Sequence, residues 1–145
     1  MTATQTKKAL LNKIECAYMP VSDPGVSAEW YERVLGLKLR SPVKPGSGAI
    51  MIMGGGQWLF LLPSPGMTPL TFETTGWAGE GESFEMFPLC FETDDIAALH
   101  ASLAESGTWT EAAVRDEGGC GLQLDFKDPD GNKYQAWQPP AQKGE

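Results

Sequence analysis

The sequence predicts an α+β fold in which two βαβββ units form paired, curved mixed sheets around a cleft. The first observation is that one order of strand, helix and three strands recurs in residues 13–63 and 84–139. The second is that each expected helix follows an aspartate and stops at a glycine, the usual helix-capping residues. The third is an internal repeat, because Asp23 and Asp95 lie 72 residues apart in equivalent positions.

The first unit starts with a strand and a helix. Residues 13–23 have apolar side chains at both odd-numbered and even-numbered positions, which predicts a strand covered on both faces. The helix has Ser22 or Asp23 as its N-cap and Pro24 in its first turn, and it ends at Gly36. Three more strands, separated by the glycine-rich turns PGSG and GGG, are expected at 37–44, 49–54 and 57–63.

The second unit repeats this order. Its first strand is expected at 84–93, with Phe87, Leu89 and Phe91 packed under a helix that ends at Gly107. The remaining strands are expected at 109–116, 120–127 and 133–139. The last two are joined by the sequence DPDGN, which predicts a tight hairpin turn whose aspartates, Asp128 and Asp130, bond the backbone of the turn itself.

Three segments lie outside the two units. Residues 1–12 are polar and predict a flexible arm, and residues 140–145 form a tail. Residues 64–83 form a long connection rich in Gly and Thr, which we expect to be a linker or a lid.

Composition limits the function. The 145 residues carry a net charge of −8, which argues against a nucleic-acid groove. No apolar run is long enough to cross a bilayer, and the N-terminus lacks the apolar core of a signal peptide. Cys16, Cys90 and Cys120 are an odd number of cysteines far apart in sequence, which favours a reducing, cytoplasmic location over a disulfide framework.

Three stretches resemble the vicinal oxygen chelate superfamily, the glyoxalase, bleomycin-resistance and extradiol-dioxygenase group. They are PVSDPGVSAEWYERVLGLKL (20–39), FETDDIAALHASLAESG (91–107) and FKDPDGNKYQAWQP (126–139). The resemblance covers residues 13–139 and implies a glyoxalase-like fold and a homodimer. It says little about the reaction, because the superfamily includes lyases, isomerases, dioxygenases and proteins that only bind drugs.

The resemblance also implies where a metal would bind. Metal-using members take one ligand from the first and last strand of each unit, which corresponds here to Cys16, Leu59, Pro88 and Gln135. Leu59 and Pro88 have no donor atom in their side chains, and His100 is the one histidine of the chain. A site with two histidines and one carboxylate cannot be built from one histidine. We therefore expect no metal and no cofactor.

This expectation depends on the strand register. A slip of one residue would turn every side chain to the opposite face, and Glu15 and Glu92 would then enter the cleft. We prefer the register that places Ala17 and Met19 on the side of the helix. In the strand expected at 84–93, the alternate apolar residues Phe87, Leu89 and Phe91 then face the same side.

In that register the cleft is apolar and aromatic, with a few neutral hydrogen-bonding groups, as small-molecule pockets usually are. Gln135 would orient a ligand where a relative holds a metal, and Tyr18 would assist it. The expected ligand-binding residues are Cys16, Tyr18, Gln57, Leu59, Leu61, Met86, Pro88, Cys90, Gln135 and Trp137.

The preferred function is a metal-independent small-molecule binding protein that encloses a partly apolar or aromatic ligand. One alternative is a metal-dependent lyase, isomerase or dioxygenase of the same superfamily. Another is a metal-free enzyme that uses Tyr18 or Cys16 as its acid or nucleophile. The sequence assigns no catalytic residue.

Overall fold

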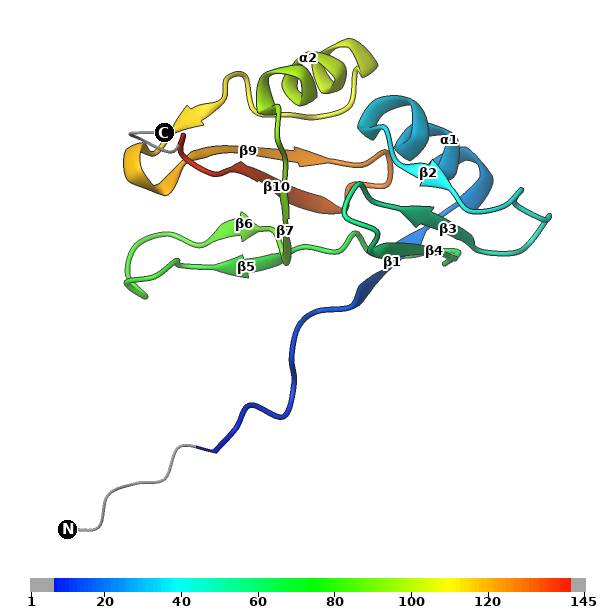
Figure 1. The fold of residues 1–145 in the computed structure, drawn as a ribbon, viewed down its shortest axis with the longest axis horizontal. Coiled ribbons are helices and arrows are strands. Elements are labelled where there is room, and N and C mark those ends of the chain that lie inside the picture. The colour runs from blue at the N-terminus through cyan, green and yellow to red at the C-terminus, as the bar shows by residue number, and fades with distance from the viewer. Residues whose placement is uncertain (1–6, 142–145) are drawn as a thin grey trace.

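Two four-stranded sheets lie beside each other with two helices on one side of them in the computed structural model, which describes residues 7–141 (Figure 1). The expected arm and tail fall partly outside these residues, at 1–6 and 142–145. No helix within residues 7–141 is long and apolar enough to cross a membrane.

The first sheet has the strand order β1-β4-β3-β2, with β1 parallel to β4. Its helix α1 spans Pro24–Leu35. The strands are β1 (Cys16–Val21), β2 (Lys38–Leu39), β3 (Ala49–Ile52) and β4 (Trp58–Pro63).

The second sheet has the equivalent order, β7-β10-β9-β8, with β7 parallel to β10. The predicted repeat of two βαβββ units is therefore confirmed. The elements of this unit are β7 (Leu89–Glu92), α2 (Ile96–Ser106), β8 (Arg115–Asp116), the 3₁₀ turn η1 (Gly118–Cys120), β9 (Leu122–Lys127) and β10 (Lys133–Gln138).

The helix ends follow the predicted capping residues. The Asp23 carboxylate accepts hydrogen bonds from the backbone N–H groups of Gly25 at 3.0 Å and Val26 at 3.3 Å. Gly36 ends α1 with a φ of 73°, a left-handed conformation that glycine adopts without strain. Local chemistry alone therefore fixes where α1 begins and ends.

The expected strand at 84–93 is wrong in one respect, because it is two strands. β6 (Phe84–Met86) pairs with β5 (Phe72–Thr74) in a separate two-stranded ribbon, and β7 starts only at Leu89. Pro88 lies at the break, where its missing N–H cannot join a ladder. The connection 64–83 thus contributes a strand of its own. β2 and β8 are also shorter than predicted, with two residues each.

One hydrophobic core contains side chains from both units. Met19, Leu59 and Leu61 of the first unit and Leu124 and Phe126 of the second are fully or almost fully buried in it. Each fully buried side chain of this size stabilises the fold by about 1.5–3 kcal/mol relative to an exposed one. The two units are therefore held together by shared apolar burial.

A buried polar network also joins the units at the DPDGN turn. The Tyr31 hydroxyl on α1 lies 2.6 Å from the Asp128 carboxylate and 2.6 Å from the Tyr134 hydroxyl on β10. Asn132 donates to the carbonyl of Pro20 at 2.8 Å. Asp128 bonds its own turn as predicted, whereas Asp130 accepts from the first unit through the backbone N–H of Ser22 at 3.2 Å.

Candidate ligand-binding site

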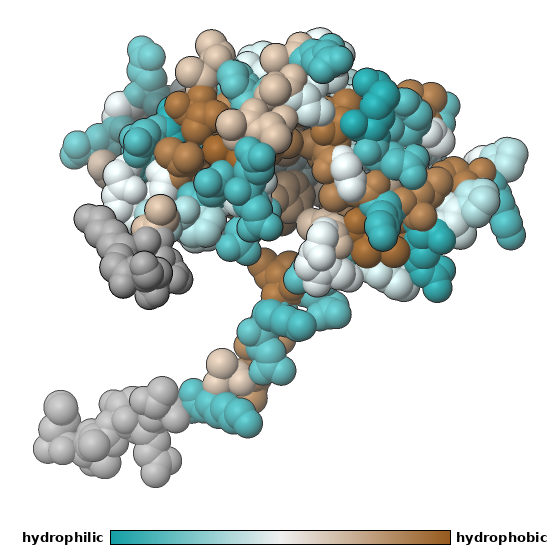
Figure 2. Space-filling view, turned by 45° about the horizontal axis from the view of Figure 1, so that its top comes forward, coloured by the Kyte–Doolittle hydropathy of each residue, from teal (hydrophilic) through white to brown (hydrophobic). Residues whose placement is uncertain are grey.

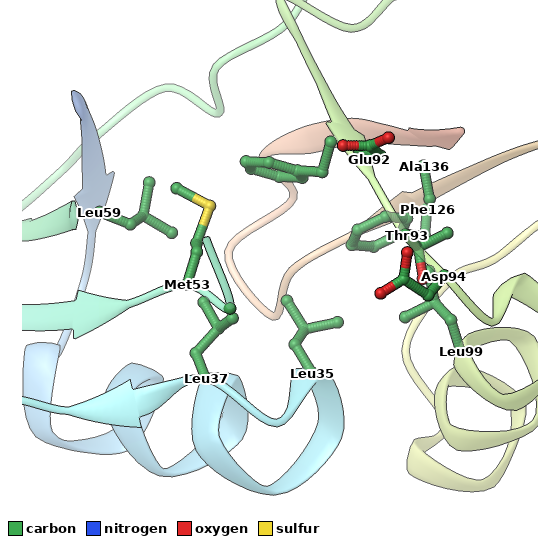
Figure 3. A pocket seen from close by; sticks show the side chains of 12 residues that line it. Leu35, Leu37, Met53, Leu59, Glu92, Thr93, Asp94, Leu99, Phe126 and Ala136 are labelled. Atoms are coloured by element: carbon green, nitrogen blue, oxygen red, sulfur yellow. The ribbon is translucent and has the colours of Figure 1, made fainter. Parts of the chain in front are cut away.

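An apolar cavity of about 250 Å³ lies between the two units on the helix side of the sheets (Figure 3). Leu35 and Leu37, at the end of α1, and Met53 line it from the first unit. Leu99 of α2 and Phe126 of β9 line it from the second. Figure 3 shows these side chains pointing toward one another across the space, with Asp94 beside Leu99 and Phe126 and with Glu92 near Ala136.

A second hollow, of about 580 Å³, continues from this cavity between the edge strands β1 and β7. The two share Met53, Phe91, Glu92 and Asp94 in their walls. Cys16 of β1 and Cys90 of β7 line the second hollow, and both thiols are free.

A third hollow, of about 280 Å³, extends onto the open face of the first sheet and shares Glu15, Cys16 and Gln57 with the second. Trp58 and Phe60 form its aromatic wall. We call the three connected hollows the inter-unit cleft. A molecule in this cleft could place an apolar group in the interior and a flat group against the aromatic wall.

Tyr18 continues the aromatic wall beyond the third hollow. Its ring stacks on Phe60 with centroids 4.5 Å apart and planes 11° apart, and its side chain is 59% exposed. Arg40 lies over the Trp58 ring, 4.8 Å from the centroid. Stacked and edge-on rings in an open sheet face suit a planar ligand.

Two predicted residues of the fourth strand face the core instead. Leu59 and Leu61 are 1% and 0% exposed, and they pair with Ala17 and Met19 on β1. The partners of Cys16 and Tyr18 are Trp58 and Phe60. The prediction was wrong by one residue because all five side chains from Trp58 to Leu62 are apolar, so alternation does not reveal which face is buried. Leu59 reaches the cavity, but from the core side.

The second unit has the predicted register. Leu89 and Phe91 pack against the core, and Cys90 lies on the open face beside Gln135, its partner in the ladder. Glu92 pairs with Trp137 on that same face, so no register slip is needed to expose it. Met86 and Pro88 are not part of this sheet, because Met86 belongs to β6 and Pro88 to the break before β7.

Gln135 is 9% exposed and sits in a side-chain network. Its Nε2 donates to Asp125 at 3.2 Å, and the Cys90 thiol donates to its Oε1 at 3.4 Å. Asp125 also accepts from Arg115 at 3.1 Å. Burial raises the pKa of the Asp125 carboxyl, and burial together with Asp125 raises the pKa of the Cys90 thiol. The network therefore fixes the Gln135 amide and disfavours a Cys90 thiolate.

Trp137 is the neighbour of Gln135 on the open face. Its indole Nε1 donates to the carbonyl of Cys120 in η1 at 2.6 Å. This bond ties the ring to the β8–β9 connection, and neither Gln135 nor Trp137 borders the inter-unit cleft. The structure thus separates these two residues from the other predicted site residues that do line the cleft, namely Cys16, Gln57, Leu59 and Cys90.

The four family positions do not fit a metal ion. Leu59 is buried in the core, and the side chain of Pro88 has no atom that could coordinate a metal. The amide of Gln135 is already hydrogen-bonded to Asp125 and Cys90. Across residues 7–141, no group of three or more His, Cys, Asp and Glu side chains is placed to hold a metal. His100 lies on α2, whereas the four family positions lie on or beside the strands.

Apart from Leu59, the apolar residues of the cavity were not predicted as site residues. Leu35 belongs to the apolar stripe of α1, and Leu99 to α2, so each reads as an ordinary core residue. No sequence signal distinguishes a core side chain that fills space from one that borders a cavity.

This architecture is that of a defined family. The model of the glyoxalase/bleomycin resistance protein/dioxygenase superfamily matches residues 11–135, and the chain belongs to this superfamily. No curated protein matches it.

Solved structures share the fold over most of the chain. A glyoxylase/bleomycin resistance protein/dioxygenase domain from Frankia sp. EAN1pec is 20% identical, with a TM-score of 0.67 and coverage of 93% of this chain and 96% of that one. TnmS3, an antibiotic-binding protein from Streptomyces sp. CB03234, is 22% identical, with a TM-score of 0.63 and coverage of 92% and 100%. The fosfomycin resistance protein FosX from Listeria monocytogenes is 10% identical, with a TM-score of 0.66 and coverage of 90% and 96%.

Proposed function

We propose that this protein binds an apolar or partly aromatic small molecule in the inter-unit cleft and does so without a metal ion. The observation that carries the proposal is the apolar cavity of about 250 Å³ that connects with the aromatic wall of Trp58 and Phe60. An apolar cavity of about 150 Å³ in a protein core is large enough to bind benzene. The present cavity therefore has room for a larger group, such as a fused pair of rings.

Apolar burial would supply the affinity. Each Å² of apolar surface removed from water contributes about 25 cal/mol, before the cost of immobilising the ligand. The Cys90 thiol, which lines the cleft, has a raised pKa, and this disfavours the thiolate that a nucleophilic attack needs. The similarity in fold to an antibiotic-binding protein is in keeping with a role in binding.

The test measures by calorimetry the binding of 1-naphthylmethanol, a neutral compound with two fused rings. Leu99→Phe should fill part of the cavity and weaken binding at least tenfold, since Leu99 lines it. Leu122→Phe is the matched control, because Leu122 also packs against the core but does not line the cleft. Binding that both variants weaken equally, or neither, would contradict this location.

We further propose that the protein is a homodimer. The side chains of Leu10 and Leu11 on the N-terminal arm, and of Ile14 just after it, are largely exposed, and the arm stands away from the rest of the molecule (Figure 2). Exposed apolar side chains on an extended arm suit contact with a second copy. Light scattering after size-exclusion chromatography tests this, and the triple change of these residues to Ser should shift the mass toward a monomer.

A reducing compartment such as the cytoplasm is the proposed location. Cys16, Cys90 and Cys120 are all free thiols, and two of them are exposed. Exposed thiols persist where the environment keeps them reduced. A fusion with a fluorescent protein, imaged in its native host, would test the location.

A further inference from the structure

We propose that the ligand of the inter-unit cleft carries a positive charge next to its apolar part, as an aromatic or branched aliphatic amine does. This rests on the proposed function and adds the chemical class of the ligand. It comes from the distribution of charge around the cleft rather than from the net charge of the chain.

The side chains that line the cleft include carboxylates but no cation. Glu92 and Asp94 border both the apolar cavity and the hollow between β1 and β7, and Glu15 borders that hollow and the aromatic wall. None of the described residues that line the three hollows is Lys, Arg or His. An amine seated at this rim would have carboxylates on both units around it.

Two carboxylates of the second half of the chain are paired with a cation, unlike those at the rim. Asp125 lies 3.1 Å from Arg115, and Glu85 lies 2.8 Å from Lys127. Within residues 7–141, Glu92 and Asp94 form no salt bridge, and Glu15 contacts Lys13 in an exposed pair at 3.6 Å. The rim of the apolar cavity therefore carries two carboxylates, Glu92 and Asp94, that no cation of the described residues neutralises by a salt bridge.

The N-terminus of α2 opposes this preference. It starts at Ile96, close to the rim, and a helix N-terminus has a partial charge of about +0.5. The Asp95 carboxylate caps it by accepting from the N–H of Ala98 at 3.0 Å, which offsets that charge. Glu92 and Asp94 then remain as the excess.

The shape of the cleft sets the form of the ligand. Figure 3 shows Glu92 and Asp94 at one side of an otherwise apolar space, so a cation must sit at the edge of the apolar group and not at its centre. A charge one or two bonds from a ring system meets this condition. The apolar group would enter between Leu35, Met53 and Phe126, and the amine would stay at the rim in contact with water.

The experiment uses three compounds with the same ring system: 1-naphthylmethylamine, 1-naphthylmethanol and 1-naphthylacetate. At pH 7 they are cationic, neutral and anionic. Calorimetry at low salt should give about fivefold tighter binding for the amine than for the alcohol, and weaker binding for the acetate, as expected for partly screened charges. Raising the salt concentration should remove the difference while the alcohol keeps its affinity.

Two double variants separate local from global charge. Glu92→Gln with Asp94→Asn should weaken amine binding about fivefold and leave alcohol binding unchanged within twofold. Glu32→Gln with Glu105→Gln removes the same two charges from the exposed sides of α1 and α2 and should leave all three affinities unchanged.

The two proposals fail in different ways. Equal affinity for the three compounds, or equal effects of the two double variants, would overturn the charge preference while the site for apolar molecules stands. No binding of any of the three compounds would overturn the proposed function and this inference with it.

Discussion

The hydroxyl of Tyr31 donates a 2.6 Å hydrogen bond to the carboxylate of Asp128, and this contact joins the helix of one unit to the hairpin turn of the other. The two residues are 97 positions apart in sequence. The same carboxylate accepts from the side chain of Asn132 at 2.8 Å, and the Tyr31 hydroxyl is also 2.6 Å from that of Tyr134. This buried network therefore links the two units in addition to their shared apolar core.

We expect Tyr31→Phe to lower the free energy of unfolding by about 1–3 kcal/mol, because it removes one donor from the buried Asp128 carboxylate and the hydrogen bond between the Tyr31 and Tyr134 hydroxyls. Urea denaturation followed by tryptophan fluorescence measures the change. Tyr18→Phe serves as the control and should change stability by less than about 0.5 kcal/mol, since that side chain is largely exposed. Equal effects of the two substitutions would show that the Tyr31 hydroxyl contributes nothing specific.

Stability should fall in alkaline solution. Burial, together with the charge of Asp128, raises the pKa of Tyr31 and of Tyr134 well above the ordinary value of 10.0. Above pH 10 the unfolded chain loses these protons while the folded protein keeps them, so the folded state binds more protons and stability decreases as the pH rises. Each tyrosine contributes up to about 1.4 kcal/mol per pH unit.

Denaturation midpoints measured between about pH 9 and pH 11 test this alkaline loss, which should begin near the ordinary tyrosine pKa of 10.0. The variant Tyr31→Phe is less stable at neutral pH but should show a shallower decline, because one titrating group is removed. A decline of unchanged steepness would rule out Tyr31 as a source of the pH dependence.

A carboxylate at position 135 should destabilise the second sheet. The amide of Gln135 donates to Asp125 at 3.2 Å, and Gln135→Glu replaces this bond with repulsion between two carboxylates in a largely buried place. We expect a loss of about 1–3 kcal/mol at pH 7 and a partial recovery at lower pH, where one of the pair is protonated. Thermal unfolding at pH 5 and pH 7 measures both effects, and Gln135→Met is the uncharged control.

The purified protein should retain less than a tenth of an equivalent of metal. Incubation with Fe²⁺, Mn²⁺, Zn²⁺ or Ni²⁺ would be followed by desalting and elemental analysis. The physical reason is that Leu59 and Pro88 offer no donor and that the amide of Gln135 is already bonded. Close to one equivalent per subunit would contradict the prediction, and Glu15 and Glu92 would be the first residues to replace.

Local signals decided much of the fold in advance. The aspartate before each helix and the glycine after it act within four residues of the chain, so the positions of α1 and α2 were predictable. The order of strands in the two units was predictable for the same reason, since turns such as DPDGN are defined by their own residues. The polar and apolar alternation of β7 likewise identified its buried face.

Local signals failed where more than one arrangement satisfied them. The run Trp58–Leu62 is apolar throughout, and only its pairing with β1 decides that Leu59 faces the core while Trp58 and Phe60 face the open side. The division of residues 84–93 into β6 and β7 is a similar case. Pro88 marks the break, but only the pairing of β6 with β5 shows where the first part goes.

The sequence by itself determined the two βαβββ units, the ends of their helices and the absence of a histidine-rich ligand set, because these depend on residue types and near neighbours. The tertiary structure alone decided the cleft. Leu35, Met53 and Phe126 are far apart in the chain and meet only when the two units pack, and Glu92 and Asp94 become its charged rim only then. A cavity is space left between surfaces that fit imperfectly, and such a fit depends on the whole fold rather than on any one segment.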